Sequence, residues 1–309
     1  MGTPGLIERL EERGVPLFVQ ALRRLPFFLS ERLLIGLAGV RALLAPARLR
    51  RVYRWAAAGG AGSRSPWAVA VGVHAHWARA WAVCPSLALL SPERLRRRLD
   101  VEGLAHLEQA RAAGGVVLLG FHLGMPSLNL VLPLLGYELT ALGQQDPIAW
   151  PDPPEAWKPF HERSRMLLWR PGLPATRAAA LLGLHKAVAR GEIVAIMGDA
   201  GEGRALFDVR LPGRPLAVRA GWFALRRLTG APILPILGHR DGARWRLTIH
   251  PPLPPPDPDE PRDREACRAA LTALLQRFVA RYPEQCSYLA MHADGPGSAP
   301  PGSLAISCS

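Results

Sequence analysis

Short apolar runs alternate along this chain with longer segments in which apolar residues follow a helical period. The run GGVVLLGF (114–121) combines β-branched residues with flanking glycines, which is typical of a buried parallel strand. Similar patterns predict four further strands, YELTALG (137–143), IVAIMG (193–198), PILPILGH (232–239) and WRLTIHP (245–251). Strands that alternate with helices indicate an α/β fold. We therefore expect a central mixed, mostly parallel sheet flanked by helices.

Helical periodicity fills most of the sequence between these strands. It predicts helices over residues 67–83, 91–112, 123–135, 155–168, 175–192, 215–230 and 263–281. Ser91 and Pro92 suit the start of the second of these, and Gly191 and Gly230 suit the ends of two others. The proline-rich segment 251–263 predicts an extended crossing. We expect three parts, a helical region at 1–57, an α/β domain at 58–292 and a disordered tail at 293–309.

Two apolar stretches raise the question of a membrane. Residues 112–137 are uncharged apart from His122 and long enough to span, but their glycines and prolines favour a strand, a turn and a helix. Residues 25–46 are interrupted by Glu31, Arg32 and Arg41. Such a pattern suits a helix on a membrane surface and suits an ordinary core-packing helix equally well. The basic, aromatic segment RLRRVYRW (48–55) favours an anionic interface, although a solvated helix face would have a similar composition.

The composition changes this picture mainly through charge. The 309 residues carry a formal net charge of +13, almost entirely from arginine. Such a surface favours polyanions, namely nucleic acid, anionic lipid or an acidic carrier protein, although a bias toward arginine codons explains part of the excess. The basic residues match no nucleic-acid-binding module, so we expect no nucleic acid partner. The four cysteines and the VHAHW segment (73–77) lack the spacing of a metal site, and the first residues lack the pattern of a secretory signal.

Three polar residues follow predicted strands, where α/β sheets place their sites. His122 follows GGVVLLGF, Asp199 follows IVAIMG and Arg240 follows PILPILGH. A histidine at such a position can accept a proton from an alcohol or amine nucleophile. A lone histidine in apolar sequence is also often a satisfied core residue. The convergence of three polar groups on one edge keeps the catalytic interpretation open beside the structural one.

Four segments, in order and with matching spacing, resemble the bacterial lipid A late acyltransferases of the lauroyl/myristoyl type, within the wider glycerolipid acyltransferase group. The resemblance runs from about residue 30 to residue 292. The segments are LDVEGLAHLEQARAAGGVVLLGFHLGMPS (99–127), LLGLHKAVARGEIVAIMGDAGEG (181–203), LPGRPLAVRAGWFALRRLTGAPILPILGHRDGARWRLTIHPPL (211–253) and ALLQRFVARYPEQCSYLAMH (273–292). The resemblance implies a glycerol-3-phosphate acyltransferase-like fold.

The resemblance also implies the chemistry and its location. His122 would be the general base that deprotonates a lipid acceptor, which then attacks a thioester carbonyl. Acyl carrier protein or coenzyme A would deliver the acyl chain as a co-substrate, with no bound cofactor and no metal. The protein would lie peripherally on the cytoplasmic face of the inner membrane, on an anionic surface. Arg240 would hold an acceptor phosphate or carboxylate, and Gly124 and Arg214 are further candidates for substrate binding.

The sequence departs from the family at the acid of the His-x4-Asp/Glu motif, where it has Ser127. It also has Asp199-Ala200 where the family usually has Asp-Gln. Three explanations stay open for Ser127: another carboxylate, Asp199 or Asp146, supplies the charge; an amine acceptor needs a weaker base; or the chain binds lipids without transferring acyl groups. The sequence therefore predicts an acyltransferase, with a non-catalytic lipid- or carrier-binding protein as the alternative. A polyanion-binding protein is a third interpretation, which rests on charge alone.

Overall fold

The computed structural model describes residues 46–89, 97–125, 128, 131–144, 164–169, 173–199, 204–242 and 244–291, with a few helical positions between 29 and 40. Ser127, Asp146 and the tail from residue 292 lie outside the described residues, as do Ser91 and Pro92. Within the described part, no helix is long and apolar enough to cross a membrane.

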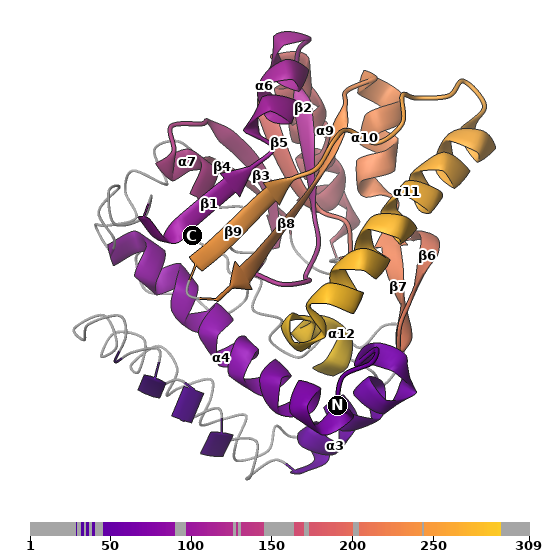
Figure 1. The fold of residues 1–309 in the computed structure, drawn as a ribbon. Coiled ribbons are helices and arrows are strands. Elements are labelled where there is room, and N and C mark those ends of the chain that lie inside the picture. The colour runs from indigo at the N-terminus through magenta and orange to yellow at the C-terminus, as the bar shows by residue number, and fades with distance from the viewer. Residues whose placement is uncertain are drawn as a thin grey trace.

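A seven-stranded sheet forms the centre of the molecule, with the strand order β1-β9-β8-β2-β5-β3-β4 (Figure 1). Its strands are β1 (Leu99–Glu102), β2 (Val116–Gly120), β3 (Leu139–Gln144), β4 (Ser164–Trp169), β5 (Ile193–Met197), β8 (Ile233–Asp241) and β9 (Arg244–Ile249). All neighbouring strands are parallel except β8 and β9, which form an antiparallel hairpin. The expected mixed, mostly parallel sheet flanked by helices is confirmed.

Helices surround this sheet and a separate hairpin. The helices are α3 (Pro46–Trp55), α4 (Pro66–Leu89), α6 (Leu104–Ala112), α7 (Val131–Leu134), α9 (Pro174–Ala189), α10 (Gly221–Thr229), α11 (Glu260–Arg281) and α12 (Ser287–Met291), with short turns η1 (Ala56–Gly60) and η4 (Pro283–Gln285). Strands β6 (Ala205–Leu211) and β7 (Arg214–Arg219) pair with each other in an antiparallel hairpin. Figure 1 shows α11 beside this hairpin, with α12 next to α3 and α4.

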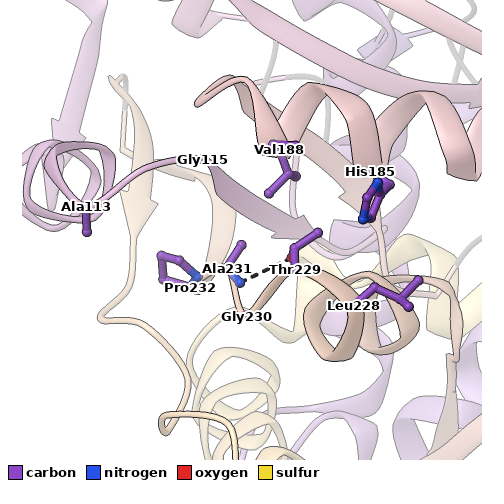
Figure 2. A pocket seen from close by; sticks show the side chains of 10 residues that line it. Ala113, Gly115, His185, Val188, Leu228, Thr229, Gly230, Ala231 and Pro232 are labelled. Carbon is purple, nitrogen blue, oxygen red and sulfur yellow. Dashed lines mark hydrogen bonds between the residues drawn. The ribbon is translucent and has the colours of Figure 1, made fainter.

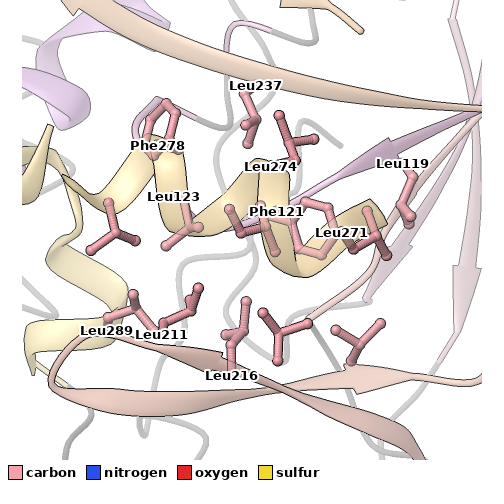
Figure 3. Close-up of a cluster of buried hydrophobic side chains, with 14 of the residues drawn as sticks. Leu119, Phe121, Leu123, Leu211, Leu216, Leu237, Leu271, Leu274, Phe278 and Leu289 are labelled. Atoms are coloured by element: carbon pink, nitrogen blue, oxygen red, sulfur yellow. The ribbon is translucent and has the colours of Figure 1, made fainter. Parts of the chain in front are cut away.

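Both faces of the central sheet are buried, as a parallel sheet requires. Alternate residues of β2 enter two different clusters: Val117 and Leu119 pack on one face, Val116 and Leu118 on the other. The first cluster continues through α11 to the hairpin, and Figure 3 shows Leu271 and Leu274 of α11 together with residues that follow β2 and residues of β6 and β7. This packing fixes the end of β2 relative to α11.

Several predicted helices are wrong in part, because strand pairing replaces them. Residues 99–102, predicted within a helix, pair with β9, and residues 164–168, also predicted as helical, pair with β3. The segment predicted as one helix over 215–230 begins as strand β7, and its helix starts only at residue 221. The turn at Gly213, where φ is +80°, returns the chain from β6 to β7 and makes this hairpin possible.

The helix predicted over 123–135 is also wrong at its start. Gly124 forms a parallel bridge with Gly238 of β8, and the backbone N–H of Met125 donates to the Gly238 carbonyl at 2.7 Å. The chain after β2 therefore runs beside β8 before α7 begins at residue 131.

Candidate active site

His122 lies just past the end of β2 and is held by a carboxylate. Its Nδ1 is 2.9 Å from Oδ1 of Asp199, and its backbone N–H donates to Oδ2 of the same residue at 2.8 Å. One carboxylate thus fixes both the backbone and the ring of His122. The contact gives the imidazole a defined orientation, which a lone core histidine would not need.

Asp199 reaches this position because β5 is the neighbour of β2 in the sheet. The Gly198 N–H donates to the Gly120 carbonyl at 2.8 Å, so the two strands stay paired up to the site. A Cβ at position 198 would lie 2.9 Å from side-chain atoms of Leu119 and Phe121, so any larger residue there would require these side chains to shift. The Asp199 side chain is fully buried beneath the imidazole.

The electrostatics of the pair suit a base. Burial lowers the pKa of His122, but the negative charge and the hydrogen bond of Asp199 outweigh it, so this pKa lies above its ordinary value. A carboxylate at Nδ1 favours the tautomer with its proton on that nitrogen, which leaves Nε2 as an acceptor. A quarter of the His122 side chain is exposed, so a substrate can reach the ring.

Gly124 belongs to the framework around this pair. Its N–H donates to the Gln285 carbonyl at 2.9 Å, and its own carbonyl is 2.9 Å from Nε2 of His76. A Cβ at this position would lie 2.1 Å from the Gly238 carbonyl oxygen, and φ is +66°. Both polar backbone groups of Gly124 thus have hydrogen-bond partners within the protein. Through these contacts and its bridge to Gly238, Gly124 connects β8, α4 and the C-terminal segment at the site.

Gln285 fixes that C-terminal segment to the end of β8. Its Oε1 accepts from the Arg240 backbone N–H at 2.8 Å, and its Nε2 donates to the Arg240 carbonyl at 2.7 Å. The Arg240 side chain donates through Nε to the Gly242 carbonyl at 2.7 Å. The guanidinium of Arg240 therefore lies at the turn between β8 and β9, whereas Asp199 lies directly against His122.

We expect Gln285→Leu to lower the free energy of unfolding by about 1–3 kcal/mol, because it leaves two backbone groups without their partners. The matched control is Gln276→Leu, since Gln276 is exposed and its side-chain amide donates to the Arg210 carbonyl at 2.8 Å. Urea unfolding of both variants measures the effect. Equal losses in the two variants would contradict a special role for the Gln285 contacts.

Arg214 approaches the site from the hairpin. Its Nη1 donates to the Leu289 carbonyl on α12 at 3.4 Å. Arg219, at the end of β7, donates its backbone N–H to the Gly198 carbonyl at 2.7 Å, directly before Asp199. Both arginines act electrostatically on the hydroxyl of Tyr288, whose ring stacks on His122. The hairpin thus places positive charge beside the Tyr288 hydroxyl.

Sequence reasoning did not single out Tyr288, Gln285 or Arg219 as site residues. Two of them fall in the segment PEQCSY, which carries part of the family resemblance, and that was the available signal. Ser127, the departure from the family motif, lies outside the described residues. The described part of the chain contains no cluster of three or more potential metal ligands.

A cavity of about 420 Å³ lies away from this site (Figure 2). It is lined by Gly115 before β2, by Pro232 before β8 and by the last residues of α9 and α10, which include Val188 and Thr229. His122 follows β2, whereas Gly115 precedes it, so the cavity lies at the opposite edge of the sheet. The cavity has no part in the chemistry of the His122–Asp199 pair.

A buried carboxylate behind an accessible histidine is an arrangement for general base catalysis. Comparison with known families agrees with this geometry. The profile of the family described as "Bacterial lipid A biosynthesis acyltransferase" matches residues 65–293, which include His122, Asp199 and α12. None of the curated proteins matches the chain. Since the match covers most of the sequence, the chain belongs to the bacterial lipid A biosynthesis acyltransferase family.

Proposed function

We propose that this protein transfers a fatty acyl chain from a thioester carrier to a hydroxyl or amine of a membrane-associated lipid or glycolipid. Its family is one of acyltransferases in lipid A biosynthesis, which supports acyl transfer to a lipid acceptor. The observation that carries the proposal is the contact of 2.9 Å between His122 Nδ1 and Asp199 Oδ1. This carboxylate supplies the charge that the family motif would otherwise place at position 127.

In the proposed reaction, Nε2 of His122 takes the proton of the acceptor as its oxygen or nitrogen attacks the thioester carbonyl carbon. Asp199 holds the ring and stabilises the imidazolium that forms. The tetrahedral intermediate then collapses, the carbon–sulfur bond breaks, and the imidazolium returns its proton to the departing sulfur. The products are an acylated lipid and the free thiol of the carrier. His122 ends the cycle neutral.

The rate is expected to depend on pH through His122. The base works only when it is neutral, and its pKa is raised, so kcat/KM should fall as pH falls through a value above about 6.5. A pH profile of kcat/KM from about pH 5 to pH 9 at low substrate concentration measures the midpoint of this decrease. A midpoint well below pH 6.5 would show that Asp199 does not raise the pKa of the active base.

Positive charge around the site supports an acidic or phosphorylated co-substrate. Acyl carrier protein is acidic and coenzyme A carries phosphates, so a net charge of +13 favours either thioester as the donor. Arg214 lies beside α12 and acts on the Tyr288 hydroxyl, and we propose that it contacts an anionic group of the donor or acceptor. Arg240 lies farther along the same edge, where it would contact an acceptor phosphate or carboxylate.

We further propose that the protein works peripherally on an anionic membrane, at the cytoplasmic face of the inner membrane. Residues 32–92 contain eight arginines and no Asp or Glu. On this part of the chain, the exposed rings of Tyr53 and Trp67 lie 6.2 Å apart, with Val71 one helical turn beyond Trp67. Exposed aromatic residues beside arginines suit the interface of an anionic bilayer. α12, which carries Tyr288, packs against both α3 and α4, so this surface adjoins the site.

The double variant Arg50→Gln and Arg54→Gln is expected to weaken binding to phosphatidylglycerol vesicles by roughly 30-fold, since each arginine near the surface contributes about 1 kcal/mol. Both residues are exposed on α3. Vesicle sedimentation measures the partition, and Arg262→Gln with Arg268→Gln on α11 is the matched control. Unchanged partition of the α3 variant would place the membrane contact elsewhere.

The transferase itself is tested with purified protein, a panel of acyl carrier protein and coenzyme A thioesters, and a total lipid extract. We expect a protein-dependent acylated lipid and the release of free thiol, with the His122→Ala protein as the blank. Lipid binding without transfer from any donor would instead support a non-catalytic lipid- or carrier-binding protein. This alternative is favoured by Ser127, which stands where the family motif has its acidic residue.

A further inference from the structure

Tyr288 contacts both members of the His122–Asp199 pair. Its ring is stacked on the imidazole, with the centroids 5.0 Å apart and the planes at 29°. Its hydroxyl donates to the backbone carbonyl of Asp199 at 3.4 Å. One side chain therefore covers a face of the base and also reaches the residue that orients it.

The position of the Tyr288 ring is set by the protein framework. α12 has only five residues, which is too short for a helix to be stable alone. Its carbonyls accept from two arginines: Leu289 from Arg214, and Met291 from Arg51. Gln285, just before α12, is fixed to Arg240 and Gly124. These anchors hold the ring against His122 without help from a substrate.

The groups around the stack leave the tyrosine neutral. Burial and the negative charge of Asp199 raise the pKa of Tyr288 to about 12, against the opposing charges of Arg219 and Arg214. Among the described residues, the charged or titratable groups that face the stack are thus Asp199 after β5, Tyr288 on α12, and the two arginines of β7. A neutral phenol presents an electron-rich ring face to the imidazole.

We propose that Tyr288 is a positioning residue of the transferase, whose ring keeps the imidazole in line with Asp199 and stabilises the imidazolium formed during transfer. The inference rests on the proposed function of the pair. An aromatic face attracts a cation whose charge lies within about 6 Å of the ring centroid, and the distance of 5.0 Å meets this condition. Because the attraction exists only for the protonated ring, it acts when His122 carries the acceptor's proton.

The direct test is an NMR titration of His122 in histidine-labelled protein, with the signal assigned by its loss in His122→Ala. In Tyr288→Leu, which keeps an apolar cover but removes the π face, the pKa of His122 should fall by roughly half a unit. In Tyr288→Phe, which keeps the stack, it should stay at the wild-type value. Tyr282→Leu is the matched control, because the Tyr282 ring is tilted over another histidine, His239, with the centroids 4.3 Å apart, and its loss should leave the pKa of His122 unchanged.

A second substitution guards against misfolding of the leucine variant. Pentafluorophenylalanine at position 288 keeps the shape of phenylalanine but withdraws electron density from the ring face, so it should lower the pKa of His122 relative to Tyr288→Phe. Steady-state kinetics should show kcat reduced several-fold in Tyr288→Leu, with KM changed less than kcat. A His122 pKa that is the same in the phenylalanine and pentafluorophenylalanine proteins would overturn the inference.

The titration needs no substrate, so it separates this inference from the proposed function. If the Tyr288 variants leave the pKa of His122 unchanged while the wild-type protein transfers acyl chains, Tyr288 has no positioning role and the His122–Asp199 mechanism stays intact. A wild-type protein that shows the pKa shift but transfers no acyl chain would overturn the transferase and, with it, the positioning role.

Discussion

Asp199→Asn is expected to lower the rate of acyl transfer by roughly 10³- to 10⁴-fold, by the same reasoning that applies to the acid of a Ser-His-Asp triad. In the native pair, Oδ2 accepts from the His122 backbone N–H and Oδ1 accepts from the ring Nδ1–H. An amide has one acceptor oxygen. If that oxygen stays with the backbone, the NH₂ group faces Nδ1 and drives the ring proton to Nε2. A protonated Nε2 cannot take the proton of the acceptor.

Initial rates at saturating donor measure this loss, with His122→Ala as the lower limit. Asp208→Asn is the matched control, because Asp208 is exposed on β6 and the same substitution should leave the rate within about twofold of wild type. A rate for Asp199→Asn within about tenfold of wild type would show that another group orients the imidazole. The sequence offers Asp146 and the serine at 127 for that role.

The partnership of His122 and Asp199 could be predicted from the sequence only in part. Both residues follow apolar runs that are recognisable as parallel strands, and the carboxyl ends of such strands meet at one edge. Which strands are neighbours depends on the crossovers that give the order β8-β2-β5-β3, and no local pattern encodes that order. The sequence therefore placed Asp199 among the candidates for the missing charge, and the geometry of the sheet brings it into contact.

For Arg240, in contrast to Asp199, the predicted position just after a strand differs from the structure. It follows the predicted strand 232–239, but β8 continues to Asp241 because β9 pairs with it as an antiparallel hairpin. Arg240 thus lies inside a strand and near its turn. The strands β1, β4 and β7 were missed for a related reason: they lie next to true helices or within segments whose Leu, Ala and Arg fit a helical period as well as a strand. Their partners in the sheet, which lie far away in the sequence, decide their structure.

Arg226→Met is expected to lower the free energy of unfolding by about 3–5 kcal/mol, because it leaves a buried carboxylate without its cation. The Arg226 side chain is 1% exposed and that of Asp263 is 0% exposed. Nη2 of Arg226 donates to Asp263 Oδ1 at 2.6 Å and also to the Pro254 carbonyl at 2.6 Å. One guanidinium therefore connects α10, the proline-rich crossing and the first turn of α11. Farther along, α11 contributes Leu271 and Leu274 to the core behind the site.

Urea unfolding at several pH values tests both the size and the cause of this loss. Burial raises the pKa of Asp263, but the hydrogen bond and charge of Arg226 outweigh it, so this pKa is below its ordinary value. A depressed pKa stabilises the fold above the pKa of the unfolded chain, and this contribution disappears as pH falls through the folded value. In Arg226→Met the unpaired Asp263 instead takes up a proton readily. The difference in free energy of unfolding between this variant and wild type should therefore be largest near neutral pH and become smaller toward about pH 4.

The matched control is Arg227→Met, since Arg227 is 30% exposed and lies 3.5 Å from Asp263 Oδ2, which predicts a loss of about 0–1 kcal/mol. The double variant Arg226→Met with Asp263→Leu removes both charges and should recover most of the stability lost by Arg226→Met. If the double variant is as unstable as the single one, the loss comes from packing and from the Pro254 contact. In that case the loss of stability in the double variant should also be independent of pH, because that variant has neither buried charge.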